Sequence, residues 1–345
     1  MTSSRPHVLV ARLDNDGDVL LTGPAVRAVA AGAGRVTYLC SPRAAPAARL
    51  LPGVDEVRTF DAPWIASPPP AVSPAQVEAL VADVAAAGID QAVVFSSFHQ
   101  SPLPLALLLR LAGVGTIAAI SVDYPGSLLD VRHAVADDIH EVQRNLSLVA
   151  TLGYALPDGD AGHLVVSRRP EALPPGMVPE GPYLVVHPGA SVPARAWSPA
   201  ANRDLVAALT QAGWPVVVTG GPSEADLCRF VAGEVGVDLC GRTDLAGLAE
   251  ILGRATAVVV GNTGPAHLAA AVQTPVVSIF APTVPSVRWA PWMVPHVLLG
   301  RQDIGCAGCR AQVCPIEGQP CITSVSVVDV VGAVSALTAN RWAVA

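Results

Sequence analysis

The sequence contains no lysine, so all 21 residues counted as lysine or arginine are arginines. This absence excludes functions that depend on a lysine side chain, such as a Walker-type phosphate loop, a pyridoxal Schiff base or a lysine nucleophile. Phosphate binding remains possible, because the guanidinium group of arginine donates two parallel hydrogen bonds to phosphate oxygens.

Charge is also scarce in this chain. Charged residues make up 14% of it, its formal net charge is −7, and its arginines form no basic stripe. Nucleic acid is therefore not expected as the main partner, because that binding depends on neutralising phosphates. The longest apolar stretch, residues 102–120, contains Arg110 and two glycines, which argues against a membrane span. No signal-peptide pattern begins the chain, so we expect a cytoplasmic protein with at most peripheral membrane contact.

The length of 345 residues favours two domains, each large enough to bury its own core. Short β-branched runs alternate with helical patterns of alanine and leucine, which is typical of parallel sheets covered by helices. We expect strands at 7–12, 35–40, 56–60, 91–97 and 116–121, and again at 183–187, 215–219, 237–239, 257–261 and 275–280. A segment rich in proline, glycine and aspartate, residues 155–182, separates the two series and indicates a linker.

These patterns predict an α/β protein with two Rossmann-like domains, residues 1–165 and 180–325. A last helical pattern within residues 326–345 lacks a strand partner and could return to the first domain. In open α/β sheets, ligands bind beyond the carboxyl ends of the strands. Functional residues are therefore expected directly after strands.

A polar turn with three aspartates, Asp14, Asp16 and Asp18, follows the first expected strand. A carboxylate at the start of a helix can act as a cap, which is the structural interpretation of this turn. A cap needs one such residue rather than three. A chemical role for one of the aspartates is therefore the second interpretation, and both stay open at this point.

In the second half, loops after four of the expected strands contain candidate ligand-binding residues. They are Ser191 and Arg195 after the strand at 183–187, Glu224 after 215–219, Asn262, Thr263, Gly264 and His267 after 257–261, and Thr283 after 275–280. A helix that begins near Gly264 would direct backbone amides and its positive dipole end at a phosphate. Structural alternatives exist for Arg195 on the surface, for Glu224 beside a helix dipole and for His267 in the core.

Together these motifs resemble glycosyltransferase family 9, the heptosyltransferases. Gly17-Asp18 followed by Val-Leu-Leu-Thr22-Gly-Pro resembles the N-terminal motif of the family. The Pro-Gly-Ala-Ser191 segment and the Gly-Asn262-Thr-Gly-Pro-Ala-His segment resemble two later motifs, in the family's order. Many members have lysine at the position of Arg195 and aspartate at that of Asn262. The resemblance implies the GT-B fold, in which two Rossmann-like domains face each other across a cleft.

The resemblance further implies an inverting, metal-independent transfer of heptose or a related sugar. The donor would be a nucleotide-diphosphate sugar, ADP-linked in the best-known members, and the acceptor a hydroxyl of a glycan, a glycolipid or a small molecule. Asp18 would be the general base, with Gly17 and Thr22 in the acceptor-side loop. The donor-side residues would be Ser191, Arg195, Glu224, Asn262, Thr263, Gly264, His267 and Thr283. Arg195 would neutralise the leaving diphosphate, and Glu224 would hold the ribose.

Three other functions are alternatives to this one. A nucleotide-dependent oxidoreductase is disfavoured, because no Gly-x-Gly-x-x-Gly follows any expected strand. A GT-B-type sugar-nucleotide epimerase or hydrolase, and a sugar-nucleotide-binding protein without turnover, stay open. Product analysis with and without an acceptor distinguishes them.

Four of the seven cysteines form a Cys-x2-Cys-x4-Cys-x6-Cys cluster, namely Cys306, Cys309, Cys314 and Cys321. Four thiolates can hold a zinc ion or an iron–sulfur cluster, although this spacing differs from that of a zinc ribbon. Disulfides are disfavoured in a reducing cytoplasm. Both a structural metal site and four metal-free cysteines therefore stay open as interpretations of this cluster. The other three cysteines, Cys40, Cys228 and Cys240, are expected to be buried.

Overall fold

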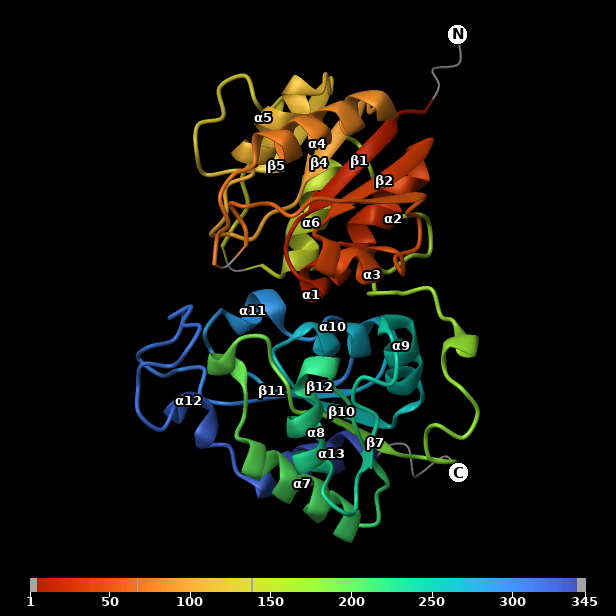
Figure 1. Cartoon of the computed structure of the whole chain (residues 1–345), viewed down its shortest axis with the longest axis vertical. Coiled ribbons are helices and arrows are strands. Elements are labelled where there is room, and N and C mark those ends of the chain that lie inside the picture. The colour runs from red at the N-terminus through yellow and green to blue at the C-terminus, as the bar shows by residue number, and fades with distance from the viewer. Residues whose placement is uncertain (1–4, 67, 138, 340–345) are drawn as a thin grey trace. The chain divides into compact units, whose positions relative to one another are not determined.

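A computed structural model describes residues 5–66, 68–137 and 139–339 (Figure 1). The chain divides into two compact units, Met1–Ser167 and Arg168–Ala345. This division lies between residues 165 and 180, the domain limits proposed from the sequence. Each unit contains one six-stranded sheet in which every neighbouring pair of strands is parallel.

The sheet of the first unit has the order β3-β2-β1-β4-β5-β6. Its strands are β1 His7–Arg12, β2 Arg35–Cys40, β3 Glu56–Thr59, β4 Gln91–Val94, β5 Thr116–Ile120 and β6 Val131–His133. Its helices are α1 Asp16–Leu20, α2 Gly23–Gly32, α3 Ala45–Ala48, α4 Pro74–Ala87, α5 Leu103–Leu111 and α6 Glu141–Ala150, with a 3-10 turn at Pro42–Ala44. The five strands expected here from the sequence are confirmed, and β6 was missed.

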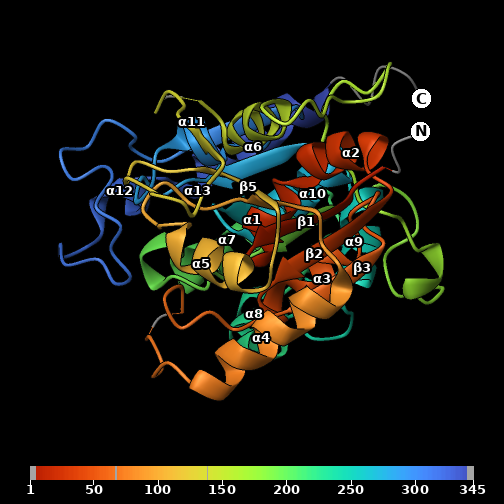
Figure 2. The same cartoon turned by 90° about the horizontal axis from the view of Figure 1, so that it is seen from above.

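Both faces of this sheet are covered by helices, which explains why its central strands are apolar without alternation. The helices α4 and α5 pack beside each other on the face that carries Leu9 and Leu39 (Figure 2). The helices α2 and α6 pair on the opposite face. Residues Val8 to Ala11 of β1 are consequently fully buried.

The sheet of the second unit has the order β12-β11-β10-β7-β8-β9. Its strands are β7 Leu184–His187, β8 Val216–Val218, β9 Val237–Asp238, β10 Ala257–Gly261, β11 Val276–Ile279 and β12 His296–Leu299. Its helices are α7 Pro199–Gln211, α8 Ala225–Ala232, α9 Leu245–Arg254, α10 Gly264–Ala271, α11 Ser286–Trp289, α12 Pro320–Thr323 and α13 Val327–Thr338, with 3-10 turns at Pro170–Ala172, Pro193–Arg195 and Pro222–Glu224. The strand β12 was not expected from the sequence.

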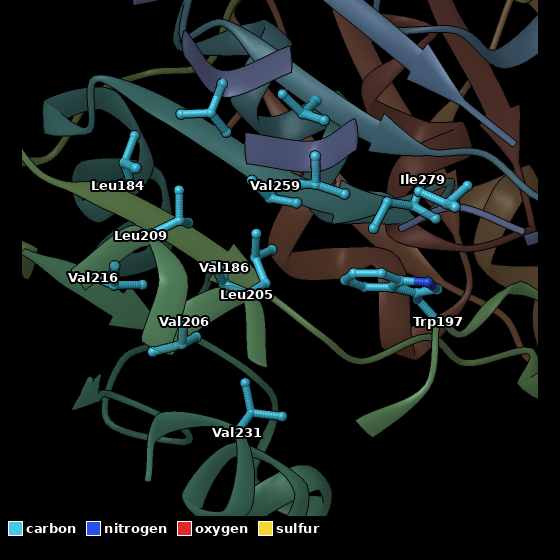
Figure 3. Packing of buried hydrophobic residues seen from close by; sticks show 14 of the residues in the cluster. Leu184, Val186, Trp197, Leu205, Val206, Leu209, Val216, Val231, Val259 and Ile279 are labelled. Carbon is cyan, nitrogen blue, oxygen red and sulfur yellow. The ribbon is translucent and has the colours of Figure 1, made fainter. Parts of the chain in front are cut away.

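The main core of this unit lies between the sheet and the helices α7, α8 and α13. Figure 3 shows Trp197 among its members, together with Leu205 and Ile279. Trp197 follows the β7 loop and is only 6% exposed. It is therefore a packing residue that anchors the end of this loop in the core.

The C-terminal helix α13 corrects one expectation. It packs against α7 and against β10, β11 and β12 of the second unit. Val330, Ala333 and Val334 are buried in the core of that unit. The apolar face of the helix is used there rather than in a return to the first domain, and residues 340–345 lie outside the described part of the chain.

The strand order reverses once in each sheet. From β1 the chain moves outward to β3 and then returns to β4 on the other side of β1, and β7 and β10 repeat this pattern. Loops that leave two such strands diverge and open a crevice at their carboxyl ends. Each unit thus places a potential ligand site after its first and fourth strands. Among the helices of the described residues, none is long and apolar enough to cross a membrane.

Candidate functional site

A buried arginine organises the reversal point of the first unit. Arg12 ends β1, and its side chain is 1% exposed. Its Nε lies 2.7 Å from Asp14 Oδ2, its Nη2 donates to Asp18 Oδ1 at 2.9 Å, and its Nη1 lies 3.5 Å from Glu141 Oε2. Burial alone would lower the pKa of Arg12, but the surrounding carboxylates raise it well above its ordinary value. The cation is therefore retained inside the unit.

The loop after β4 completes the environment of Asp14. The Ser97 hydroxyl donates to Asp14 Oδ2 at 3.1 Å and accepts a hydrogen bond from Arg12 Nη2 at 2.8 Å. Gln100 Nε2 donates to Asp14 Oδ1 at 2.6 Å. Asp14 is thus a buried structural acid that connects the ends of β1 and β4.

Helix α6 contributes two charged residues to the same network. Glu141 is 1% exposed, and Arg144 Nε lies 3.1 Å from Glu141 Oε1. The sequence alone could not separate these residues from a solvated helix surface. Together with Ser97 and Gln100, and with Arg12 itself, they are members of the site that sequence reasoning missed. The available signal was a charged residue, Arg12, at the end of an otherwise apolar strand.

Asp18 differs from the other carboxylates of the network in its exposure. Its side chain is 19% exposed, against 5% for Asp14 and 1% for Glu141. It lies in the first turn of α1, whose N-cap Asn15 makes no side-chain cap hydrogen bond. Asp18 therefore combines a fixed orientation with access from solvent, which a general base needs.

The neighbouring Asp16 has a different environment. Burial raises the pKa of Asp16 to about 6, while the Arg43 guanidinium acts in the opposite direction. A carboxyl group with this pKa is partly protonated near neutral pH. Asp16 is consequently the natural comparison for Asp18, since both lie in the first turn of the same helix.

The acceptor-side residues need one correction. Gly17 is a buried residue of α1. Thr22 is 0% exposed, donates its hydroxyl hydrogen to the Val19 carbonyl oxygen, and lies 2.8 Å from the Tyr38 hydroxyl. Thr22 has no surface to offer to an acceptor, so its role is to hold the start of α2 against β2.

In the second unit, the candidate donor-side residues follow four strands that are neighbours in the sheet, β8, β7, β10 and β11. Three of their loops are joined directly. Arg195 Nε donates to Thr283 Oγ1 at 3.1 Å, which connects the β7 and β11 loops. Asn262 Nδ2 donates to the Ala281 carbonyl oxygen at 3.2 Å, which connects the β10 and β11 loops.

The start of α10 contains polar atoms that the protein does not satisfy. Asn262 Oδ1 and Thr263 Oγ1 are buried and have no hydrogen-bond partner among the described residues. Thr263 is the N-cap of α10 and makes no side-chain cap hydrogen bond. Each such atom costs about 1–3 kcal/mol when it stays unpaired, so a ligand that hydrogen-bonds to both would remove this cost.

Glu224 joins the β8 loop to the β7 loop. Its Oε2 accepts a hydrogen bond from the Gly221 N–H at 2.7 Å, which caps the 3-10 turn Pro222–Glu224. A Cβ atom placed on Gly189 would lie 1.8 Å from Glu224 Oε1, so a larger residue there would displace the Glu224 carboxylate. Nearby, His187 Nδ1 lies 3.0 Å from Thr219 Oγ1, and burial lowers the pKa of His187 against the opposing effect of Glu224.

The other predicted residues differ in accessibility. Ser191 is exposed on the β7 loop, and Gly264 is half-buried at the start of α10. His267 and Thr283 are only 5% and 3% exposed. Because Thr283 is buried, we expect it to position Arg195 through their hydrogen bond rather than to contact a ligand directly.

The four clustered cysteines lie together in the second unit. They line one small cavity, which Thr283 also borders. Burial raises the pKa of the Cys321 thiol, and Cys314, Cys306 and Cys309 add to this effect. Cys40 and Cys228 are buried as expected, and Cys240 is half-buried.

Two parallel-sheet α/β units, each with polar loops at its strand-order reversal, define the double-Rossmann class of GT-B proteins. The model of glycosyltransferase family 9 (heptosyltransferase) matches residues 102–319, more than half of the chain. The chain belongs to this family. The match includes all the candidate donor-side residues, whereas Asp18 lies before it.

Individual relatives agree with this assignment. Lipopolysaccharide heptosyltransferase 1 of Pseudomonas aeruginosa is 32% identical over 226 residues, which cover 63% of this chain and 62% of the relative. The matched region thus spans less than two thirds of that relative's length.

Solved structures share the fold over nearly the whole chain. The family 9 glycosyl transferase of Veillonella parvula has a TM-score of 0.78 at 16% identity and covers 99% of both chains. Escherichia coli heptosyltransferase WaaC with ADP-2-deoxy-2-fluoro heptose has a TM-score of 0.69 at 21% identity, covering 94% of this chain and 98% of the other. The predicted fold class is therefore confirmed.

Proposed function

We propose that the protein is an inverting, metal-independent glycosyltransferase that moves heptose or a related sugar from an ADP-linked donor to a hydroxyl acceptor. Family membership supports the reaction class. The relative named lipopolysaccharide heptosyltransferase 1 and the neighbour solved with an ADP-heptose analogue support the donor and a glycan or glycolipid acceptor. Within this proposal, residues 1–165 supply the base and residues 180–325 bind the donor.

The observation that carries the proposal is the environment of Asp18. Its carboxylate is oriented by a buried guanidinium group and keeps the largest exposed fraction of the acids in the network. In the proposed step, Asp18 takes the proton of the acceptor hydroxyl as the oxygen forms a bond to the anomeric carbon. The bond between that carbon and the diphosphate breaks, and the electron pair leaves with the diphosphate.

The donor-side loops are suited to the leaving group. Arg195 carries a positive charge in the loop after β7, and α10 begins after the neighbouring strand β10 with its positive dipole end. The charge that develops on the diphosphate would be stabilised by these groups. Glu224 would hold the ribose hydroxyls, a role compatible with its place between the β7 and β8 loops.

The experiment compares Asp18→Asn with Asp16→Asn, an equivalent change in the same helical turn. With ADP-heptose and a deacylated lipopolysaccharide core as acceptor, Asp18→Asn should lower kcat by about 10²- to 10⁴-fold. Calorimetry should give the same ADP affinity for both variants as for the unmodified protein. Asp16→Asn should keep most of the turnover.

Two results would contradict the proposal. If Asp18→Asn retains turnover while Asp16→Asn loses it, the base is misassigned. Release of free sugar at the same rate with and without acceptor would identify a hydrolase instead.

A further inference from the structure

Residues 301–323, here called the cysteine loop, hold the two loops that carry Arg195 and Thr283. The Gly308 N–H donates to the Pro282 carbonyl oxygen at 2.7 Å, and the Arg310 N–H donates to that of Thr283 at 3.0 Å. On the β7 side, the Ala194 N–H donates to the Gln312 carbonyl oxygen at 3.0 Å, and the Ala194 carbonyl accepts from the Gln319 side chain at 2.7 Å. The cysteine loop is therefore a brace between these two loops.

This brace has little regular structure of its own. Its one helix is the single turn Pro320–Thr323. Arg310 and Gln319, which both make the bracing hydrogen bonds, have positive φ angles of 54° and 46°. Such conformations are unfavourable for residues other than glycine and persist where the surroundings enforce them.

All four cysteines of the loop line a single cavity of about 20 Å³, together with Ala194, Pro282, Thr283 and Ala311. This volume is about what a single water molecule or ion needs. Its lining contains four thiols and no amine, imidazole or carboxylate. Four sulfur ligands select a thiophilic cation with tetrahedral preference, of which Zn²⁺ is the leading example.

We propose that the cysteine loop binds one Zn²⁺-like cation through Cys306, Cys309, Cys314 and Cys321. Binding forms four metal–sulfur bonds and releases the four thiol protons to solvent, without oxidation or reduction. Within the described ranges, no three His, Cys, Asp or Glu side chains are placed where they could hold a metal ion together. The thiols must therefore turn into the cavity as the ion binds.

The ion would act on the neighbouring site through the brace. It fixes the loop segments that hydrogen-bond to Ala194, Pro282 and Thr283, and Thr283 in turn accepts the hydrogen bond of Arg195. Metal binding should therefore strengthen binding of ADP, an effect that rests on the proposed function. Groups that orient a site from outside typically change affinity by about 10- to 100-fold.

The first test measures the metal itself. Full-length protein is purified without chelator, dialysed against Zn²⁺ and then against metal-free buffer, and analysed for metals. One equivalent per chain is expected, and Co²⁺ in its place should give the visible bands of a tetrahedral thiolate centre. Cys309→Ser, a change at an exposed position, should lose the ion. Cys40→Ser is the matched control, because Cys40 lies in the other unit and its Sγ donates to a carbonyl oxygen.

Two outcomes overturn the metal site. One is unmodified protein without retained metal, whose four thiols react with a thiol reagent equally with and without Zn²⁺. The other is a disulfide within the cluster, detected by mass spectrometry of protein purified without reductant.

The second test measures ADP affinity by calorimetry before and after chelation, and again after Zn²⁺ is restored. A loss of about tenfold that Zn²⁺ reverses is expected. If the ion binds but ADP affinity does not change, the coupling is overturned and the metal site stands. If ADP binds neither form, the proposed function fails independently of the metal site.

Discussion

Replacement of Arg12 by methionine tests whether the charge network of the first unit stabilises that unit. Methionine keeps much of the length and volume of the side chain but removes the guanidinium group. Three carboxylates then lose their shared cation, and two of them, Asp14 and Glu141, have side chains that are no more than 5% exposed. Removal of one partner of a buried ion pair is destabilising, because the remaining charge stays away from water.

The size of the destabilisation depends on the hydrogen bonds and ion pairs that each carboxylate keeps in Arg12→Met. Asp14 keeps its hydrogen bonds from Ser97 and Gln100, and Glu141 keeps Arg144. Asp18, at 19% exposure, can be partly solvated. We therefore expect the lower end of the range for broken buried pairs, about 3 kcal/mol. This free energy corresponds to roughly a 10²-fold larger opening constant.

Hydrogen exchange measured by mass spectrometry suits this prediction, because it follows each unit separately. Peptides from β1 and α6 should exchange roughly 10²-fold faster in Arg12→Met, and peptides from β7 and α7 should not change. Arg35→Met is the matched control. Arg35 pairs with Glu56 at the surface, with 54% of its side chain exposed, so its loss should cost less than about 1 kcal/mol. Equal exchange rates in β1 for the two variants would refute the reasoning.

Two further changes test the second unit. Gly189→Ala would place a Cβ atom 1.8 Å from Glu224 Oε1 and should lower the free energy of unfolding, measured in urea titrations, by about 1–3 kcal/mol. Gly305→Ala is the control, because its added Cβ meets nothing within 4 Å and should leave this free energy unchanged. Equal losses in the two variants would contradict the reasoning. The hydrogen bonds from Arg168, more than its charge, lower the pKa of Glu250 below its ordinary 4.5. The folded pKa is thus below the unfolded one, so the stabilisation is full above about pH 4.5 and is lost as the pH falls through the folded pKa. Glu250→Gln should therefore lower Tm at pH 7 and progressively less toward pH 3, and a constant difference would count against this pair.

The fold was largely predictable from the sequence because its signals are local. Ten strands were expected from apolar β-branched runs, and each has a counterpart in the two sheets. The missed strand β6 is a three-residue edge strand, Val131–His133, with no apolar run. Its pairing with β5 is supported by Arg132, whose Nε donates to the Ser121 carbonyl oxygen, and no local pattern encodes such a contact.

The site was predictable only in part, because many of its contacts join distant positions. The residues after each strand could be selected, since ligands bind beyond the carboxyl ends of parallel strands. Which of them meet could not, because Arg12 and Ser97 are 85 positions apart and Arg195 and Thr283 are 88 apart. Thr22, in contrast, was selected as a site residue but is buried. It matched a family motif by position, although its hydroxyl is fully used inside the unit.

The two strand-order reversals have the same topology but present different chemical groups. In the first unit, the loop after β4 donates hydrogen bonds to the buried Asp14, and Asp18 beside Arg12 is the partly exposed carboxylate. In the second unit, Asn262 Oδ1 and Thr263 Oγ1 stay without partners in the described part of the chain, at a helix start beside Arg195 and its loop. A carboxylate held by a buried guanidinium group suits proton transfer, since movement of the base would weaken its alignment with the acceptor. An incompletely satisfied helix start suits a ligand that supplies the missing partners. The groups that stay accessible differ between the two units, a carboxylate in the first and a helix start beside an arginine in the second, and this difference is the physical reason to propose proton transfer at the first unit and diphosphate binding at the second.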